Sequence, residues 1–492
     1  MSGRRAMAVR HEVTGTLETV TAIRAGGWGS SAHADLVVAR DGLGRLMIPG
    51  TSLAGALRSW LGSVTAPGGG ALFDQGALGA VFGALEHHGQ DGMVCRMMVD
   101  DAVADLDARV DVRDGVGIDR AAGSAAAGVL YQHEVVPPGT RFAVRMTAAQ
   151  TAVDTERVSL ALDLLVQALA AGRVEIGAAR TRGLGQVRLI GITRTRVDLA
   201  DRHQVLGWLC GRPAPAPAAD VALPGDGRLG IEITWAAVTP VMVRASTVNE
   251  AEPERDRSVD TVPLRSGSAG PDGGAALLLP GSSVKGVLRS HAERIVRTIT
   301  AVGGIPDRWL DQVNDPRLGP VTALFGTAGD HRVREEGTTL PGRRGALSVR
   351  DCLGTAAERV VTHVAVDRWT GGAAENLLFS VQEPVSADWQ PIRISLDAER
   401  AGSPSDEDGG QALALLLLVL RDLADGWLAL GFGGTRGRGS IRVSRVAFTG
   451  EGLTGVWAGL SGRTLAEVID DQPDGVRRAF MAWQQGAADE RG

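Results

Sequence analysis

The sequence predicts an α+β fold in two tandem units, each running strand, helix, two strands, helix, strand. The first observation behind this prediction is a phrase that occurs twice, and internal repeats are strong indicators of architecture. It is "IPGTSLAGALRS" at 48–59 and "LPGSSVKGVLRS" at 279–290. The second observation is that two more landmarks follow each copy in the same order. These are "AVFGALE" and "GAARTRGLGQVRL" after the first copy, and "ALFGTAG" and "GFGGTRGRGSIRV" after the second.

Length and composition agree with two globular domains. A chain of 492 residues is too long for one ordinary core, and 44% hydrophobic with 22% charged residues is typical of folded proteins. The longest apolar run, 412–420, is far shorter than the roughly 20 residues that span a bilayer. The N-terminus has no secretory pattern, so we expect a cytoplasmic protein. The net charge of -6 disfavours binding of nucleic acid by bulk charge alone.

Each unit is expected to open with a strand and a helix. Residues His11–Ile23 and Arg228–Val243 are β-branched and partly alternating, which favours strands. After the repeated phrase, apolar residues recur at helical spacing, and Thr51, Ser282 or Ser283 offers an N-cap.

A second helix is expected later in each unit, at Thr155–Gly172 and Gly409–Gly426. Each ends at a glycine and leads into a strand, a Gly/Arg-rich turn and another strand. The whole order is that of the ferredoxin-like βαββαβ unit. The expected organisation is a first domain at 1–200, a Pro/Ala/Gly-rich linker at 201–227, a second domain at 228–450 and a C-terminal helical appendage at 451–492.

The repeated phrase is a candidate anion site, because backbone N–H groups at a helix N-terminus attract phosphate. It is no Walker A loop, since Gly286 follows Lys285. An ordinary capped helix is the alternative, but the duplication with Arg58 and Arg289 favours phosphate binding. Lys285 is the only lysine of the chain, and Ala54 takes its position in the first copy. The candidate contacts of the phrase are Gly50, Thr51, Ser52, Gly281, Ser282 and Ser283.

The two Gly/Arg turns are candidate phosphate contacts as well, because glycine admits another backbone and arginine pairs with phosphate. A tight hairpin that needs glycine is the alternative. Aromatic residues make up only 4% of the chain, which disfavours base stacking on a sheet. The acid-rich segment at 100–115 is interpreted as a solvated face. The candidate residues of the turns are Arg180, Arg182, Gly183, Arg436 and Arg438.

In this order, the motifs resemble the RAMP superfamily, and specifically the backbone subunits of CRISPR type III effector complexes. The resemblance covers residues 8–197 and 228–449, so the chain is similar to the fused subunits of types III-D and III-E. It implies an RRM-like palm with an inserted β-hairpin thumb in each half. It also implies guide RNA, single-stranded target RNA and other effector subunits as partners.

The resemblance also implies particular residues. A Gly-rich loop with Gly26 and Gly27 precedes the first phrase, and an aspartate of such a loop cuts target RNA in the family. Asp35 and Asp260 take that position, with a divalent metal, Mg²⁺, as the expected cofactor. The stretch between Asp260 and the phrase is longer than its counterpart, so the two loops differ in length.

Each thumb is marked by an Asp-Arg pair, at Asp119 with Arg120 and at Asp367 with Arg368.

Two other functions remain open. The chain could be a purely architectural RNA-binding backbone, because a loop aspartate commonly caps a turn. It could also process guide RNA as an endoribonuclease, with His33 or His11 as the general base.

Overall fold

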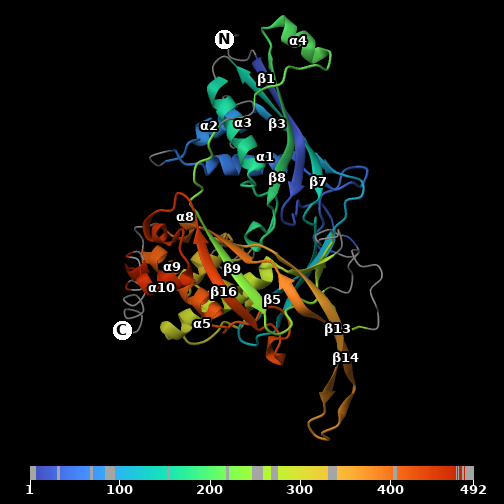
Figure 1. The fold of residues 1–492 in the computed structure, drawn as a ribbon, viewed down its shortest axis with the longest axis vertical. Helices are drawn as coiled ribbons and strands as arrows, with labels where there is room; N and C mark the ends of the chain where they lie inside the picture. Colours follow the sequence, from blue (N-terminus) through green and yellow to red (C-terminus); the bar gives the residue numbers. More distant parts are fainter. Residues whose placement is uncertain are drawn as a thin grey trace. The chain divides into compact units, whose positions relative to one another are not determined.

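The computed structural model forms two compact units that interleave along the chain (Figure 1). Unit 1 contains Met1–Val110, Glu134–Arg180 and Leu184–Pro224, and unit 2 contains Asp111–His133, Thr181–Gly183 and Gly225–Gly492. Segments 111–133 and 181–183, which the sequence assigns to the first domain, therefore belong to unit 2. The residues described are 7–29, 31, 34–66, 70–83, 95–151, 155–217, 221–245, 259–267, 275–330, 341–402, 407–472, 474, 476–478 and 481.

The sheet of unit 1 has the ferredoxin-like order. Strand β1 lies between β7 and β8, β3 pairs with β7, and all these pairs are antiparallel. In chain order the neighbours are the second, third, first and fourth strands of a βαββαβ unit, as predicted. The elements are β1 (Met7–Thr19), β2 (Met47–Ile48), α1 (Gly50–Gly62), α2 (Gln75–Phe82), β3 (Met97–Val99), β4 (Ala102–Ala104), β7 (Arg141–Thr151), α3 (Thr155–Ala170), η1 (Arg180–Arg182), β8 (Val187–Asp198) and α4 (Arg202–Leu209).

Unit 2 repeats this sheet with the order β12-β15-β9-β16. Its antiparallel pairs match those of unit 1 strand by strand. The elements are β5 (Asp111–Ile118), β6 (Ala125–Val135), β9 (Arg228–Ala237), β10 (Arg265–Ser266), β11 (Ala276–Leu279), α5 (Gly281–Ile299), α6 (Trp309–Val313), α7 (Gly319–Phe325), β12 (Leu347–Val349), β13 (Cys352–Val366), β14 (Ala373–Trp389), β15 (Ile392–Asp397), α8 (Ala398–Ala401), α9 (Glu407–Ala424), η2 (Gly434–Arg436), β16 (Ile441–Thr449), η3 (Gly455–Leu460) and α10 (Leu465–Asp471).

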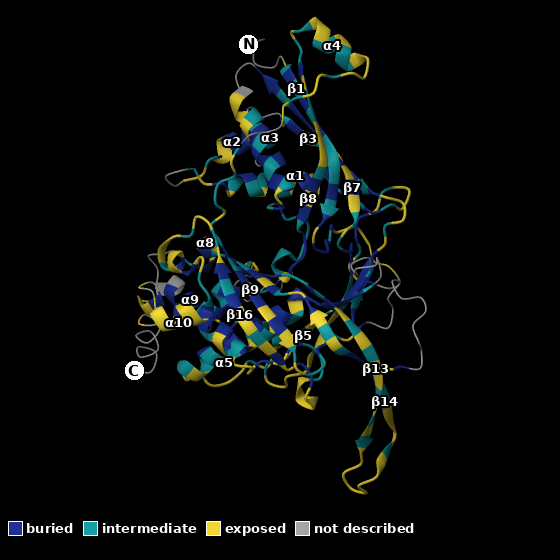
Figure 2. Ribbon diagram, viewed as in Figure 1, coloured by how far each residue is buried: buried dark blue, intermediate teal, exposed yellow. Residues whose placement is uncertain are grey.

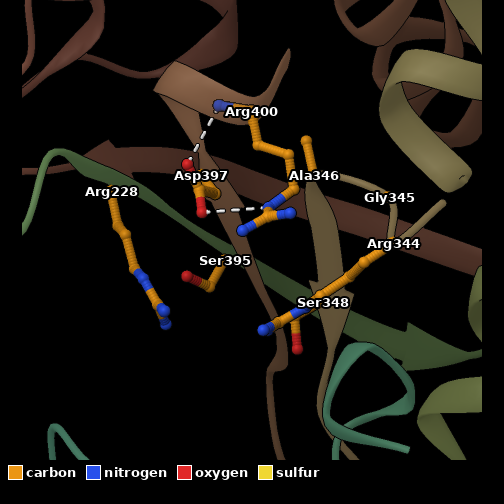
Figure 3. A pocket seen from close by; sticks show the side chains of 8 residues that line it. All are labelled: Arg228, Arg344, Gly345, Ala346, Ser348, Ser395, Asp397 and Arg400. Carbon is orange, nitrogen blue, oxygen red and sulfur yellow. Dashed lines mark hydrogen bonds and ion pairs between the residues drawn. The ribbon is translucent and has the colours of Figure 1, made fainter. Parts of the chain in front are cut away.

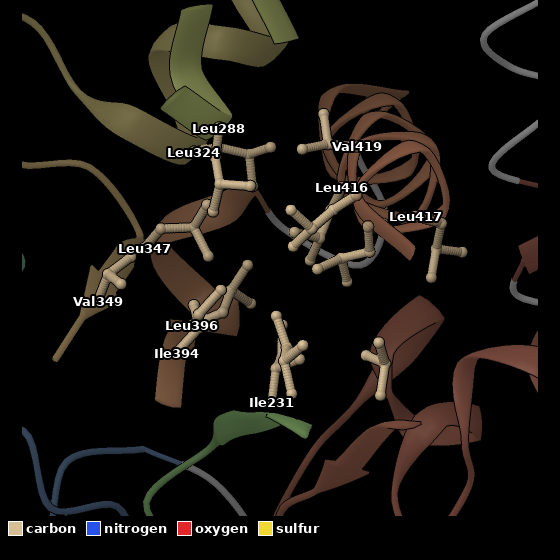
Figure 4. Close-up of a cluster of buried hydrophobic side chains, with 14 of the residues drawn as sticks. Ile231, Leu288, Leu324, Leu347, Val349, Ile394, Leu396, Leu416, Leu417 and Val419 are labelled. Carbon is tan, nitrogen blue, oxygen red and sulfur yellow. The ribbon is translucent and has the colours of Figure 1, made fainter. Parts of the chain in front are cut away.

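The core of unit 2 lies between one face of its sheet and the helices above it (Figures 2 and 4). Leu288 of α5, Leu324 of α7 and Leu416 of α9 meet Leu347 and Ile394 of the sheet, and all five are at most 2% exposed. Burying each such side chain contributes about 1.5–3 kcal/mol. The helical spacing after the repeated phrase thus marks the core face correctly, and Leu53, Leu57 and Leu61 of α1 are buried in the same way in unit 1.

Two β-hairpins correspond to the predicted thumbs. The first is β5–β6 and the second is β13–β14, whose far end extends away from the sheet of unit 2 (Figure 1). Their tips form the same turn: the N–H groups of Gly123 and Gly371 both donate to the carbonyl of the tip aspartate at 2.9 Å. Asp119 and Asp367 each accept two further backbone N–H groups at 2.8 Å. The Asp-Arg pairs therefore mark the two tips.

Three local predictions differ from the structure. Strands β1 and β9 end at Thr19 and Ala237, earlier than expected. After β1, the Ile23 N–H turns to the Val136 carbonyl at 2.9 Å. The linker contains helix α4, which Asp201 caps by accepting from two backbone N–H groups. The described part of the C-terminal segment joins the core of unit 2 through Trp457, Leu460, Leu465, Val468 and Val476.

No helix within the described ranges is long and apolar enough to cross a membrane.

Candidate nucleic-acid interface

The repeated phrase begins a helix in both units. At each helix N-terminus, a carboxylate of the protein itself accepts a hydrogen bond from the first backbone N–H group. Asp101 Oδ1 accepts from the Gly50 N–H at 2.7 Å, and Asp351 Oδ1 accepts from the Gly281 N–H at 2.9 Å. A Cβ on either glycine would lie about 2 Å from a carbonyl oxygen, that of Val99 or Val349, at the end of the strand that precedes the aspartate. Glycine at this position therefore serves a close backbone approach.

These contacts correct the predicted capping. The N-caps are Pro49 and Pro280, with no side-chain cap, so neither Thr51 nor the serines serve as caps. The side chains of Thr51, Ser52 and Ser282 are exposed and that of Ser283 is half-buried. Asp101 also lies in the acid-rich segment interpreted as a solvated face, and it is exposed, whereas Asp111 of that segment is only 2% exposed. That interpretation is wrong for Asp111.

The matched arginines of the phrase point to the protein itself. Arg58 Nη1 donates to the Gly83 carbonyl at 2.7 Å, and Arg289 Nη1 donates to the Gly326 carbonyl at 3.1 Å. Gly83 and Gly326 end the helices that carry the repeated "FG" landmark. Arg289 also bonds to Glu293 at 2.8 Å. The repeat therefore preserves a helix-to-helix clamp, which explains both arginines without a phosphate.

Lys285 is buried and bound to backbone oxygens. Its Nζ donates to the Leu347 carbonyl at 2.8 Å and to the Thr181 carbonyl at 3.3 Å. Burial, followed by repulsion from Arg289 and other arginines, lowers the pKa of Lys285 to about 7. The single lysine thus fastens the Gly/Arg turn of the first half to the sheet of unit 2.

Replacement of Lys285 by methionine is expected to flatten the pH dependence of stability. A folded-state pKa near 7, against an ordinary value of 10.5, means that the unfolded chain binds the additional proton between these pH values. The free energy of unfolding therefore rises with pH in this window, by at most about 1.4 kcal/mol per pH unit. Urea unfolding at pH 7, 8 and 9 measures the difference. Parallel curves for wild type and Lys285→Met would contradict this assignment.

The two aspartate loops make an equivalent backbone contact. The Glu134 N–H donates to the carbonyl of Leu36, the residue after Asp35, at 2.9 Å, and the Gln382 N–H donates to the carbonyl of Thr261, the residue after Asp260, at 2.9 Å. Glu134 lies near the end of β6 and Gln382 lies within β14, and each is on the return strand of its hairpin. Asp35 and Asp260 therefore occupy equivalent positions despite the unequal loop lengths.

Asp260 is exposed but structurally engaged. Its carboxylate accepts from the Ser380 N–H at 2.7 Å and from Ser380 Oγ at 3.0 Å. These hydrogen bonds, the backbone one first, lower the pKa of Asp260, so the group is ionised at neutral pH. Asp35 is exposed too, whereas His33 lies outside the described residues. His11 is 5% exposed on β1, and burial lowers its pKa, so it is not placed to meet a polymer.

An aromatic residue of each hairpin holds an arginine of each Gly/Arg turn. Arg182 Nη1 donates to the Tyr131 hydroxyl at 2.5 Å, and the guanidinium of Arg436 lies 5.6 Å from the Phe379 ring and 5.7 Å from that of Phe432. Cation–π contact orients a guanidinium while leaving its N–H edge available. Sequence reasoning missed the aromatic partners, although each follows its tip aspartate by 12 positions, from 119 to 131 and from 367 to 379.

Other arginines of the turns are less accessible. Arg438 is 5% exposed, and its Nε donates to Glu383 Oε1 at 2.7 Å while Nη2 contacts His363 Nε2 at 2.7 Å. Arg180 is half-buried, and a Cβ on Gly183 would lie 2.3 Å from the Val349 carbonyl. Gly26 and Gly27 lie in the loop after β1, where the Gly27 N–H donates to the Val37 carbonyl at 2.9 Å.

The hairpin tips differ in their surroundings. In unit 2, Arg120 Nε donates to Glu293 at 2.7 Å, and its backbone N–H donates to the side chain of Gln312 at 2.9 Å. Arg368 at the second tip is exposed, as is Trp369 beside it. The first tip is therefore docked on α5 and α6, whereas the second presents an arginine and a tryptophan to solvent.

A small basic pocket lies on the sheet face of unit 2 opposite the core (Figure 3). Ser348 of β12 and Ser395 of β15 are paired neighbours that line it, and Arg400 donates to Asp397 at 3.3 Å. Arginine and serine donors around a narrow opening suit a phosphate oxygen. The lining residues are Arg228, Arg344, Gly345, Ala346, Ser348, Ser395, Asp397 and Arg400.

A resident metal would have few protein ligands. Within the described ranges, no three His, Cys, Asp or Glu side chains gather to hold one. Mg²⁺ commonly binds one or two carboxylates together with water and substrate phosphates. A single ionised carboxylate such as Asp260 fits that mode, with RNA supplying the remaining oxygens.

The candidate residues thus divide into two groups. Strand β14 of unit 2 holds the exposed Asp260 through Ser380 and the exposed Arg436 through Phe379. Lys285, Arg289, Arg120 and the buried Arg438 instead hold the fold together. Duplicated palms with hairpins, each flanked by a loop aspartate and an oriented arginine, define a tandem polymer-binding protein.

The comparison with protein families agrees with this class. The family model of the RAMP superfamily matches residues 16–188 and 263–442. The chain belongs to the RAMP superfamily, with one match in each half, and is a CRISPR-associated RNA-binding protein. The comparison with curated proteins gives no match.

Proposed function

We propose that the chain is a fused backbone subunit of a CRISPR type III effector complex that holds guide RNA and cuts complementary RNA at two places. Asp35 and Asp260 act at the two cuts. The observation that carries this proposal is the equivalent hydrogen bond beside each aspartate, from Glu134 to Leu36 and from Gln382 to Thr261 at 2.9 Å. Equivalent loops in duplicated palms suit a pair of equivalent reactions.

The chemistry is attack of a target 2′-hydroxyl on the adjoining phosphorus. A P–O bond forms to the 2′-oxygen, the P–O bond to the 5′-oxygen breaks, and the products are a 2′,3′-cyclic phosphate and a 5′-hydroxyl. The ionised aspartate takes the 2′-hydroxyl proton or binds Mg²⁺, which would supply charge stabilisation, and the leaving 5′-oxygen takes a proton from water. Arg182 and Arg436, oriented by their aromatic partners, contact phosphates of the bound RNA.

The partners follow from the same proposal. Guide RNA and single-stranded target RNA run along the palms, and other effector subunits adjoin them. The exposed Arg368 and Trp369 at the second tip suit an external contact, because the equivalent Arg120 is already paired within unit 2.

Alanine substitution of the two aspartates tests the cutting. In a complex assembled with guide RNA, Asp35→Ala and Asp260→Ala are each expected to remove a different cut by at least about 100-fold, and the double variant to remove both. Asp41→Ala is the matched control, since Asp41 is a loop aspartate of unit 1 that holds Arg45. Mapping the ends of a labelled target RNA reads out each cut, with and without chelator.

An architectural backbone without cutting is the second candidate. The observation that favours it is the engagement of the Asp260 carboxylate by the Ser380 N–H and hydroxyl, which is the contact of a turn-stabilising residue. Persistence of every cut in the double variant, with guide RNA still bound, would establish this candidate and reject the catalytic assignment.

A further inference from the structure

Trp28 is an exposed aromatic residue on the same loop as Asp35. Its side chain is 102% exposed, more than any other large hydrophobic residue in the part of the chain that the structure describes. The loop is closed by a bridge between Gly26 and Val38 and by the Gly27 N–H donating to the Val37 carbonyl at 2.9 Å. Trp28 and Asp35 are both held just beyond this closure, on opposite arms of one short loop.

Space beside Gly26 and Gly29 is open, whereas Gly27 packs against the backbone of Val38. A Cβ added to Gly26 or Gly29, on either side of Trp28, would meet nothing within 4 Å. Gly29 has a φ of +92°, which a residue with a side chain rarely adopts, so it gives the arm a sharp change of direction. Small residues thus leave both faces of the indole ring accessible.

The surroundings of Trp28 favour a nucleic-acid base over a protein pocket. A tryptophan at the centre of a protein interface is usually ringed by other side chains that exclude water. Trp28 is instead flanked by glycines, and the acidic Asp35 is exposed on the opposite arm. An isolated aromatic face is what base stacking needs, and it accepts any base.

We propose that Trp28 stacks on an unpaired base of the target RNA and thereby holds the adjoining linkage at Asp35. This inference rests on the proposed function of the chain. It assigns base stacking to the first loop only, because residues 244–259, which precede Asp260, contain no aromatic residue. The two cuts should therefore differ in their dependence on an aromatic side chain.

This asymmetry provides an internal control for the experiment. In the guide-loaded complex, Trp28→Ala is expected to slow the Asp35-dependent cut by about 5- to 150-fold, the range for the loss of one stacked base. The Asp260-dependent cut of the same RNA should stay unchanged, and Trp28→Phe should restore most of the first cut. Leu43→Ala, which removes a side chain 81% exposed from the next loop, is the matched control.

Ultraviolet cross-linking gives a readout that does not need cutting. Trypsin cleaves after Arg24 and Arg40, so Trp28 and Asp35 fall in one peptide, 25–40. After irradiation with a single-stranded target RNA, mass spectrometry should find a nucleotide on Trp28 in the wild-type complex. An equal rate of the first cut in Trp28→Ala, or a wild-type complex that binds RNA without this adduct, overturns the inference alone. A wild-type complex that binds no RNA overturns the proposed function as well.

Discussion

Replacement of Asp351 by alanine is expected to destabilise unit 2 by about 3–5 kcal/mol, the cost of breaking a buried ion pair. Asp351 Oδ1 accepts from the Gly281 N–H, and Oδ2 accepts from Arg113 Nη1 at 2.6 Å. The two side chains of the pair are only 7% and 5% exposed. Among the described residues, Nε and Nη2 of Arg113 have no hydrogen-bond partner, and Asp111 is a second carboxylate that interacts with this guanidinium by charge alone.

The first unit supplies the matched control for this prediction. Asp101 makes the same contact to Gly50, so Asp101→Ala should cost only the loss of a cap, about 0.5–2 kcal/mol. Chemical unfolding measures both variants. Because Arg113 lies on β5, hydrogen exchange of the β5–β6 hairpin should rise in Asp351→Ala. Equal losses in the two variants would show that the cap, and not the ion pair, dominates.

These two aspartates show where sequence reasoning fails. The repeat predicts the helices and the hairpin tips, because each depends on residues close together in sequence. The sheet order joins distant strands and is predicted only because the order of elements matches the ferredoxin-like unit. The caps come from residues 52 positions after Pro49 and 71 positions after Pro280, and unequal insertions hide such a correspondence. The local pattern instead predicts Thr51, Ser282 or Ser283 as the caps. In the structure Thr51 and Ser282 are exposed to solvent and Ser283 is half-buried.

Sequence reasoning also could not predict that the first hairpin belongs to unit 2. Nothing near Arg120 or Asp111 indicates that their partners are Glu293 and Ser266, more than 150 positions away. The residues of the candidate site are likewise predicted only in part. The matched aspartates and the arginine-bearing turns are found from the repeat, whereas the burial of Lys285 and Arg438 depends on long-range packing.

Variants of Arg438 distinguish a structural role of this arginine from an RNA-binding role most clearly. Its equivalent in unit 1 is Leu184, and the equivalent of its partner Glu383 is Val135. Leu184 and Val135 pack together with Ala22 as a small apolar cluster. The duplicated framework thus accommodates either an ion pair or two apolar side chains at this junction.

Arg438→Leu alone is expected to cost at most about 3–5 kcal/mol, because Glu383, 4% exposed, loses its buried partner and keeps only the exposed Arg359 at 3.3 Å. The double variant Arg438→Leu with Glu383→Val copies the apolar pair of unit 1 and should be as stable as wild type or more stable, since well-packed apolar residues often replace a buried ion pair without loss. Unfolding of both single variants and the double variant gives the coupling energy.

The same variants test RNA binding by Arg438. The stable double variant keeps the exposed Arg436 on its aromatic partners, so any change in guide-RNA affinity reports on Arg438 itself. Because that side chain is already paired with Glu383 and His363, we expect unchanged affinity. A loss of affinity at preserved stability, with a smaller dependence on salt, would instead assign Arg438 to a phosphate.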